Sequence, residues 1–271
     1  MLCKVDDFNK IVKGFHDDNV SWVYLKTIKY MLSSKLYVDG ILDDISIIVE
    51  KNECNESDGC SVLDFGCGSG IIAYLLSHSF SKKSSYFAID TDDIENDNGV
   101  SNPIDNENII FAQSRLWEKI GGITNINFSH YDGRRLPYDD GSFDCIVAYA
   151  VIEHVGTNNI KNILIELNRV LKDGGKLFIF KFPRKLSYQE FMAKIMGVGH
   201  HSFTYSDKEA KVIFSEVFKV EEIWKGDMVF EFPPSFSNYL YWPLKWINYV
   251  LERTPFKVFS HHNGLALSKL N

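Results

Sequence analysis

A glycine-rich turn between a strand and a helix constrains this chain more than any other feature. Residues 61–65 form an apolar run that predicts a buried strand, and an apolar helical pattern follows at residues 71–76. Between them, Gly66, Gly68 and Gly70 occupy alternate positions. Glycine permits positive φ and has no Cβ, so a ligand can approach the backbone closely. Because the N–H groups that begin the next helix point to the same place, the turn is predicted to bind a small ligand.

The residues around these glycines indicate the kind of ligand. A dinucleotide-binding turn has the pattern G-x-G-x-x-G, but Ile71 takes the third glycine position here. Asp64, at the end of the predicted strand, would repel a pyrophosphate and attract a cationic amino or sulfonium group. The turn therefore disfavours an NAD-dependent dehydrogenase.

Two further predicted strands also end in acidic residues. Residues 86–90 end in Asp90, which follows Gly70 by 20 residues and precedes Thr91. In a βαβ unit this spacing brings a carboxylate to the tip of the neighbouring strand, where it can accept hydrogen bonds from ribose hydroxyls. Another strand, predicted from residue 126 onward, ends in Asp132. The three acidic residues are thus expected at one edge of a sheet.

Together with two later segments, these residues resemble the class I S-adenosylmethionine-dependent methyltransferases. DFGCGSG at residues 64–70 resembles motif I of that family. LPYDDGSFDCIV at residues 136–147 resembles its approach to the fourth strand. LNRVLKDGGKL at residues 167–177 resembles its corner before the fifth strand, with Asp173 in place of the usual proline. The set covers about residues 61–182 in the family's order and spacing.

The resemblance implies an α/β fold and a cofactor. The fold would be a Rossmann-like, doubly wound, seven-stranded sheet whose last strand is antiparallel and lies between strands five and six. The cofactor would be S-adenosylmethionine, with its methionine part held by Asp64 and the glycine backbone, its ribose by Asp90 and its adenine by Asp132. The cofactor-binding residues are accordingly predicted to be Asp64, Gly66, Cys67, Gly68, Gly70, Asp90, Thr91, Asp132, Gly133 and Tyr149.

The segment after the fourth strand is predicted to face the transferred methyl group. Residues 143–149 predict that strand, and ligands of open α/β sheets bind at the carboxyl ends of strands. The following segment, YAVIEHV, resembles the family's x-x-L-E-H-V. His154 is either a general base, since imidazole titrates near neutral pH, or part of a hydrogen-bonded structural turn with Glu153. Tyr149 is predicted to contact the cofactor or the acceptor.

The segment after the fifth strand is where such enzymes build the acceptor pocket. The strand is predicted at residues 176–182, and Arg184 follows it. Arg184 is a candidate ligand for a carboxylate or phosphate, and His200 and His201 are candidate bases or acceptor ligands. A solvated polar turn is the alternative for all three. Since adjacent side chains on an extended strand face opposite sides, no metal site is predicted from the two histidines.

Two regions lie outside this predicted core. Residues 1–55 predict an N-terminal helical lid, and residues 56–271 the methyltransferase domain with an aromatic-rich insertion at 226–262. In the lid, one helical pattern is formed by Ile41, Ile45, Ile48 and Val49, and candidate site-lining residues are Phe15, His16, Tyr24, Tyr30 and Tyr37.

The insertion itself contains aromatic residues at helical spacing. Tyr239, Trp242, Trp246 and Tyr249 predict one amphipathic helix. Three explanations stay open: packing on the domain, a dimer interface, or an apolar surface for a lipid-linked or aromatic acceptor, with peripheral contact to an anionic membrane. On either side, the chain predicts a helix at 206–214 that begins with a capping box, a strand at 217–224 and a final strand at 264–270.

The composition excludes several classes of protein. The net charge of −7 argues against broad binding to nucleic acid, which needs a basic face. Five scattered cysteines contain no C-x-x-C pair, which argues against a zinc site or a disulfide framework. No apolar run reaches the ~18 residues of a spanning helix, and the charged N-terminus is unlike a signal peptide. A soluble protein in the cytoplasm is expected.

The predicted function is transfer of a methyl group from S-adenosylmethionine to a hydroxyl or amine of a small molecule or glycoside. Residues 182–201 loosely resemble methyltransferases of polysaccharide and secondary-metabolite biosynthesis. The chain lacks the N/D-P-P-Y/F and Pro-Cys motifs of nucleic-acid base methyltransferases. The alternatives are an aminopropyl transferase, for which no acidic polyamine pocket is evident, and a non-catalytic cofactor-binding protein that acts through partner contacts. The acceptor atom, the use of a base and the choice between monomer and homodimer stay open.

Overall fold

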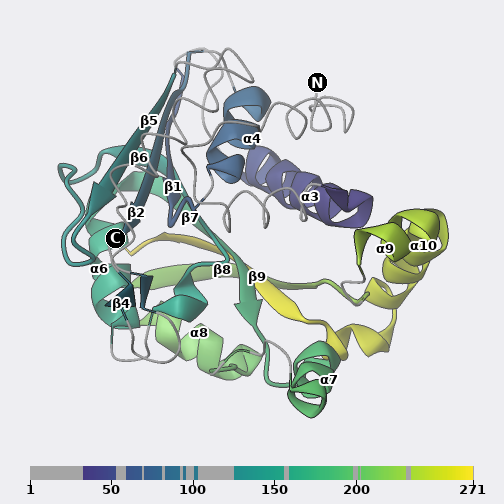
Figure 1. The fold of residues 1–271 in the computed structure, drawn as a ribbon. Coiled ribbons are helices and arrows are strands. Elements are labelled where there is room, and N and C mark those ends of the chain that lie inside the picture. The colour runs from purple at the N-terminus through teal and green to yellow at the C-terminus, as the bar shows by residue number, and fades with distance from the viewer. Residues whose placement is uncertain are drawn as a thin grey trace. The chain divides into compact units, whose positions relative to one another are not determined.

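The computed structural model (Figure 1) describes most of the chain from residue 33 onward. The candidate lid residues Phe15, His16, Tyr24 and Tyr30, together with His200, lie outside the described residues. The described residues are 33–52, 59–68, 70–80, 83–91, 94–95, 101–102, 125–155, 159–197, 201, 203–229 and 233–270.

A seven-stranded sheet has the strand order β5-β2-β1-β6-β7-β9-β8. β9 is antiparallel to both of its neighbours, whereas the pairs β1–β2, β2–β5 and β6–β7 are parallel. The predicted doubly wound fold is therefore confirmed, including the position of the last strand between the fifth and sixth. The strands are β1 (Ser61–Phe65), β2 (Ser85–Thr91), β5 (Ile126–Tyr131), β6 (Phe143–Tyr149), β7 (Leu171–Pro183), β8 (Phe218–Gly226) and β9 (His262–Lys269), with β3 (Ile94–Glu95) and β4 (Ser101–Asn102) forming a separate pair.

The chain divides into two compact units, and the first comprises Met1–Pro137 and Pro233–Tyr239. It contains the parallel strands β5, β2 and β1, against which α4 (Ile71–Ser79) packs. The helix α3 (Lys35–Lys51) contacts α4 and α9 (Pro234–Tyr239), as Figure 1 shows. The buried face of α3 includes the predicted Ile41, Ile45 and Ile48, but Val49 is exposed because it lies off that face.

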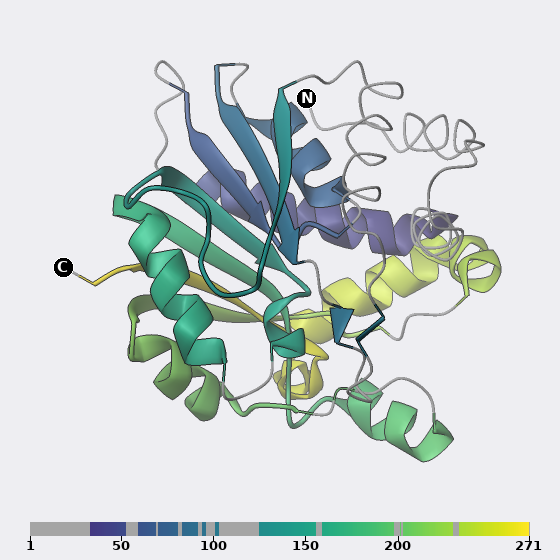
Figure 2. The ribbon, with the colours of Figure 1, turned by 60° about the vertical axis from the view of Figure 1, so that its left-hand side comes forward.

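The second unit comprises Tyr138–Phe232 and Leu240–Asn271. Here α6 (Ile160–Val170) contacts β7 and α8 (Asp207–Ser215) contacts β8 (Figure 2). The predicted capping box at the start of α8 is confirmed: Ser206 Oγ accepts from the Glu209 N–H, and Glu209 accepts from the Ser206 N–H. The unit also contains α7 (Tyr188–Met196).

The strand β9 fits between β7 and β8 at a glycine. Trp224 of β8 pairs with Gly264 of β9, and a Cβ at position 264 would lie 2.2 Å from the nearest atom of the indole ring. No side chain can occupy that space, so the indole of Trp224 covers the bare backbone of β9. The indole also meets the ring of Phe180 edge to face, with centroids 5.6 Å apart. Gly264 therefore permits the close packing of this sheet.

The aromatic insertion forms two helices and a short 3-10 segment rather than one long helix. Tyr239 ends α9, whereas Trp242, Trp246 and Tyr249 belong to α10 (Tyr241–Glu252), so the expectation of a single helix was wrong. The 3-10 helix η2 is Pro255–Phe259. Trp242 is 75% exposed and Trp246 is 66% exposed, which counts against packing as the explanation of these two side chains. None of the helices among the described residues combines the length and apolar character that crossing a bilayer requires.

Candidate active site

The glycine turn after β1 has the backbone conformation that its sequence predicts. Gly66, Gly68 and Gly70 have φ values of 71°, 48° and 75°, a region that other residues rarely adopt. The Gly70 N–H donates to the carbonyl of Cys67 at 2.7 Å and closes the turn. The N–H groups of Gly66 and Cys67 both donate to the carbonyl of Ile89, so the turn is tied to β2.

Asp90, at the end of β2, completes this arrangement from the neighbouring strand. Its Oδ2 accepts a hydrogen bond from the Gly68 N–H at 2.6 Å, and its Oδ1 accepts one from the Thr91 N–H at 2.8 Å. Burial raises the pKa of Asp90, and these two backbone hydrogen bonds act in the opposite direction. We call residues 64–70 together with Asp90 the glycine cradle. Its carboxylate and its bare backbone lie together, as the spacing predicts.

Asp64 lies beneath the first turn of α4. It is almost fully buried, and its Oδ2 accepts a hydrogen bond from the Ala73 N–H at 2.9 Å. Burial raises the pKa of Asp64 to about 7, which the Ala73 hydrogen bond opposes and the charge of Asp90 reinforces. Burial likewise raises the pKa of the Cys67 thiol well above its usual value, so Cys67 packs in the turn as a neutral side chain.

The third acidic residue follows β5. Asp132 is exposed, and its Oδ1 accepts hydrogen bonds from the N–H groups of Arg134 and Arg135. These bonds lower its pKa, so it is a carboxylate at neutral pH. Gly133 lies against Thr91, since a Cβ there would be 3.7 Å from Thr91 Cγ2. The predicted cofactor residues of the first unit thus occur at the carboxyl ends of β1, β2 and β5, the edge where such sheets bind ligands.

The end of β6 begins the candidate site of the second unit. Tyr149 is buried and stacks on Phe180 of β7, with ring centroids 5.6 Å apart. The chain then passes through Ala150, whose φ of 53° is unusual for a residue with a side chain, into the 3-10 helix η1 (Ile152–His154). The strand therefore ends in a sharp change of direction.

In this turn the neighbouring side chains of Glu153 and His154 differ in their exposure to solvent. The Glu153 side chain is 2% exposed, whereas that of His154 is 64% exposed. Burial raises the pKa of Glu153 to about 8, so its carboxyl is largely protonated at neutral pH. Glu153 Oε2 is buried without a hydrogen-bond partner among the described residues, whereas His154 is presented to solvent, where an acceptor can reach it.

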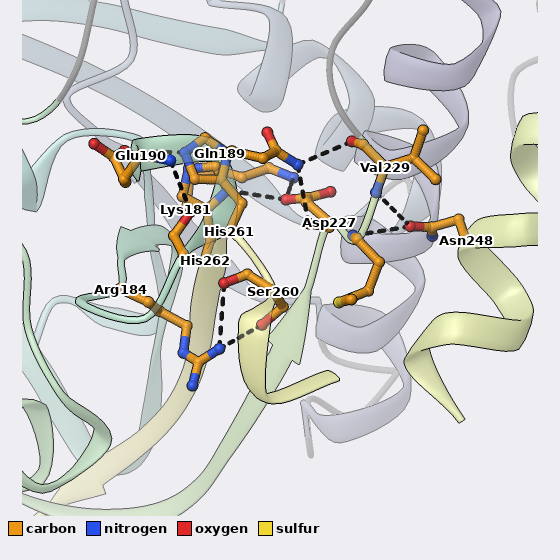
Figure 3. Close-up of polar contacts among 12 residues, drawn as sticks. Lys181, Arg184, Gln189, Glu190, Asp227, Val229, Asn248, Ser260, His261 and His262 are labelled. Atoms are coloured by element: carbon orange, nitrogen blue, oxygen red, sulfur yellow. Dashed lines mark hydrogen bonds and ion pairs between the residues drawn. The ribbon is translucent and has the colours of Figure 1, made fainter. Parts of the chain in front are cut away.

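His201, after α7, lies close to His154, with ring centroids 6.3 Å apart. Glu190 of α7 accepts from His201 Nδ1 at 2.5 Å and from the His201 N–H at 3.0 Å. Glu190 also accepts from His261 Nε2 at 3.0 Å (Figure 3). Burial alone would raise the pKa of Glu190, but the hydrogen bonds from His261 and His201 outweigh it and lower the pKa to about 2.

Arg184 contacts protein groups rather than an open pocket. Its side chain is almost completely buried, and its guanidinium donates to Ser260 Oγ at 2.7 Å (Figure 3). It also donates to the Val258 carbonyl at 2.9 Å and to Asp207 Oδ1 at 3.2 Å. These contacts fix the segment that leads to His261. We therefore leave Arg184 out of the proposed acceptor site.

The sequence did not indicate several polar residues that the structure brings together where β7 and β8 end and β9 begins. His262 Nδ1 donates to Asp227 Oδ2 at 3.0 Å, and the same oxygen accepts from Lys181 Nζ at 2.6 Å (Figure 3). Lys181 and Asp227 both have φ of 61°. With Ala150, they are the positive-φ residues other than glycine in the described ranges, and all three lie at the carboxyl ends of β6, β7 and β8. Such strain concentrates at functional sites.

The comparisons with known proteins agree with this geometry. Residues 63–179 match a family model described as a methyltransferase domain. An arsenite methyltransferase of Aquipseudomonas alcaligenes is 32% identical over 124 residues, or 45% of this chain and 32% of the relative. The sterol 4-C-methyltransferase strm-1 of Caenorhabditis elegans is 26% identical over a segment that covers 67% of this chain and 48% of the relative. The chain thus spans half or less of the length of these two relatives.

A solved structure extends the likeness of fold beyond the matched segment. The magnesium protoporphyrin IX methyltransferase of Synechocystis PCC 6803, determined with bound SAH, superposes with a TM-score of 0.55. The comparison covers 98% of this chain and 94% of that chain at 14% identity. At that identity the likeness concerns the fold alone. The chain is therefore similar in sequence to methyltransferases over residues 63–179 and similar in fold to a solved methyltransferase over nearly its whole length.

Proposed function

We propose that the protein transfers the methyl group of S-adenosylmethionine to a hydroxyl or amine of a small molecule or glycoside. The observation that carries the proposal is the contact between Asp90 and the Gly68 N–H, which joins a carboxylate to a bare glycine backbone at the carboxyl ends of two parallel strands. A nucleoside needs these two features together, one for its ribose hydroxyls and one for close approach of the ligand.

Each predicted cofactor contact has a physical reason. Asp64 supplies negative charge for the cationic methionine end, and the positive-φ glycines leave room beside the backbone. Asp90 accepts hydrogen bonds from the ribose. Asp132 is an exposed carboxylate that accepts a hydrogen bond from the adenine amino group. Tyr149 offers a buried aromatic surface at the end of β6.

The reaction requires little covalent chemistry from the protein. The sulfonium already activates the methyl group, so the chain must align donor and acceptor and exclude water. An alcohol must lose its proton as the methyl group arrives, and His154 is the exposed imidazole that we assign to this step. His201, with its ring centroid 6.3 Å from that of His154, is assigned to binding the acceptor.

The relatives do not select the acceptor. Their names specify arsenite and a sterol carbon, which differ in the reacting atom and in polarity. The pair of neighbouring imidazoles favours an acceptor that carries a proton, such as a hydroxyl or an ammonium group. The exposed Trp242 and Trp246 favour an acceptor with an apolar part, including one presented at a membrane surface.

Calorimetric titration with S-adenosylmethionine and S-adenosylhomocysteine tests the first step. Wild type is expected to bind both, and Asp90→Ala to bind each at least tenfold more weakly, about 1.4 kcal/mol. Asp173→Ala is the control, because Asp173 is an exposed aspartate of the other unit. If wild type binds neither ligand, the proposal fails.

A screen with radiolabelled donor tests the second step. His154→Ala is expected to lower kcat for hydroxyl acceptors by 10²- to 10⁴-fold while the donor affinity stays unchanged. Donor binding without transfer to any hydroxyl, amine or glycoside would favour the alternative, a cofactor-binding protein that acts through partner contacts.

A further inference from the structure

We propose that Glu190, His201 and His261 form a binding site for one divalent transition-metal ion, zinc most readily. We call these three residues the histidine cluster. They come from α7, from the segment after it and from the residue before β9. The inference shares His201 with the proposed acceptor site, but its evidence does not depend on methyl transfer, because it consists of contacts within the second unit.

The donor atoms are already gathered. Glu190 Oε1 lies 2.5 Å from His201 Nδ1 and 3.0 Å from His261 Nε2, and all three donor atoms lie within 4.8 Å of one another. Ligands at about 2.0 Å from a tetrahedral zinc ion are about 3.3 Å apart. The two distances to Glu190 Oε1 are shorter than that value by less than 1 Å, so small side-chain rotations would admit the ion.

The charge balance of Glu190 supports a cation at this place. Its side chain is only 10% exposed, and its ion pairs among the described residues are with His201 and His261, not with a lysine or an arginine. A buried carboxylate without a permanent counter-charge is costly. A metal ion would replace the proton that each imidazole now shares with Glu190 and would supply the missing positive charge.

The surrounding groups hold the ligands in place. The His201 N–H donates to Glu190 Oε2 and so fixes the carboxylate. His261 is fixed through its backbone: its N–H donates to the Asp227 carbonyl, and its carbonyl accepts from the Arg184 N–H. Its ring stacks on that of His262, with centroids 3.6 Å apart. Such outer contacts orient metal ligands and are part of a functioning site.

The ligand types select the metal. Two imidazoles and one carboxylate suit zinc, iron, nickel or copper, whereas magnesium and calcium prefer oxygen ligands alone. Three protein ligands leave at least one coordination position for water or another oxygen donor. His201 is 25% exposed and His261 is 16% exposed, so solvent can reach the ion.

The test uses the full chain without a histidine tag, after removal of bound metal by a chelator. Zinc is titrated in competition with a chromophoric chelator, and Co²⁺ is added separately to record its d–d absorption bands. Wild type is expected to bind one zinc ion with Kd below about 1 μM. Glu190→Gln, His201→Ala and His261→Ala are each expected to weaken binding at least tenfold and to remove the cobalt bands.

Two control variants separate this site from adventitious binding. His78→Ala removes a histidine of α4 in the first unit, and Glu216→Gln removes an exposed carboxylate paired with Lys161. Both are expected to bind zinc like wild type. Zinc should also raise the unfolding temperature of wild type but not that of His201→Ala, the variant at the most exposed ligand.

Two results would overturn the proposal. One is the absence of stoichiometric zinc binding by folded wild type. The other is zinc binding that all three ligand variants retain while their unfolding transitions show that they are folded. In either case Glu190 would be a shared hydrogen-bond acceptor for two histidines and nothing more.

Discussion

The glycine cradle of the first unit and the histidine cluster of the second are built in different ways. The cradle follows the parallel strands β1 and β2, whereas the cluster combines a residue of α7, one after α7 and one before β9. The cradle is formed mainly by backbone N–H groups and by residues with positive φ angles. Its sequence pattern consists of seven consecutive residues together with Asp90. In the cluster, side chains from three segments meet, and Glu190 is 71 residues from His261. A backbone site depends on local conformation, whereas a side-chain site depends on the packing of the whole unit.

The largest expected effect concerns the packing around the cluster. Asp227→Asn keeps the side-chain shape and a residue type that tolerates the φ of 61°, but it removes the charge that pairs with Lys181 and His262. Because Lys181 is largely buried, we expect the free energy of unfolding to fall by about 2 kcal/mol or more. Urea denaturation measures it.

The matched control for Asp227→Asn is Asp173→Asn. Asp173 is 92% exposed and pairs with Lys269 at 3.1 Å, so its loss should change the stability by no more than about 0.5 kcal/mol. If the two variants are equally stable, the side-chain network around Asp227 contributes little to the stability of the second unit.

A second prediction tests the backbone character of the cradle. Gly66 and Gly174 have φ of 71° and 77°, so alanine at either position carries a similar backbone strain of about 1 kcal/mol. Only Gly66→Ala adds a Cβ where the ligand is expected. We therefore expect Gly66→Ala to lower the affinity for S-adenosylmethionine at least tenfold, about 1.4 kcal/mol, in calorimetric titration.

Gly174→Ala is the control for that experiment, because a Cβ at Gly174 would meet no atom within 4 Å. It should bind the cofactor like wild type although its unfolding free energy is lowered. Equal affinities of the two variants would show that the cradle does not depend on close approach to its backbone.

The smallest expected effect concerns the charge in the cradle. The pKa of Asp64 is raised to about 7, chiefly by burial, so the side chain is mostly neutral at about pH 5 and only its carboxylate attracts a cationic ligand. Affinity for S-adenosylmethionine should therefore rise between about pH 5 and pH 7, by less than about tenfold in total, and should then level off. Calorimetry at constant ionic strength measures this slope.

The variant that tests this explanation is Asp64→Asn, which cannot titrate. Its affinity should be lower near pH 7 and should not change with pH in the same interval. The same slope in the variant and in wild type would assign the pH dependence to another group.

The sequence predicts features that depend on neighbouring residues better than features that depend on residues far apart in the chain. The bounds of β1 and β6, the positive φ of Gly66 and the capping box at Ser206 were predicted correctly because each depends on neighbouring residues. The burial of Arg184 could not be predicted, since its partners lie 23 to 76 residues away along the chain.

The candidate site was predictable to the same extent. Asp90 could be placed beside the glycines because the βαβ connection fixes the spacing. Glu190 and His261 gave no signal, because nothing near either residue in sequence indicates the other. The exposure of Trp242 also depends on what the rest of the chain leaves uncovered, which helical periodicity does not report.

The position of β9 between β7 and β8 also sets an order of events during synthesis. A ribosome makes β7 and β8 first, and although β7 can pair with β6, neither β7 nor β8 can pair with β9 until β9 has emerged. Until then β8 has open hydrogen-bonding edges, and His261 has not yet joined Glu190. An unpaired strand of this kind can form incorrect pairings with other chains. The second unit should therefore depend on chaperones during translation until residues 262–269 have left the exit tunnel.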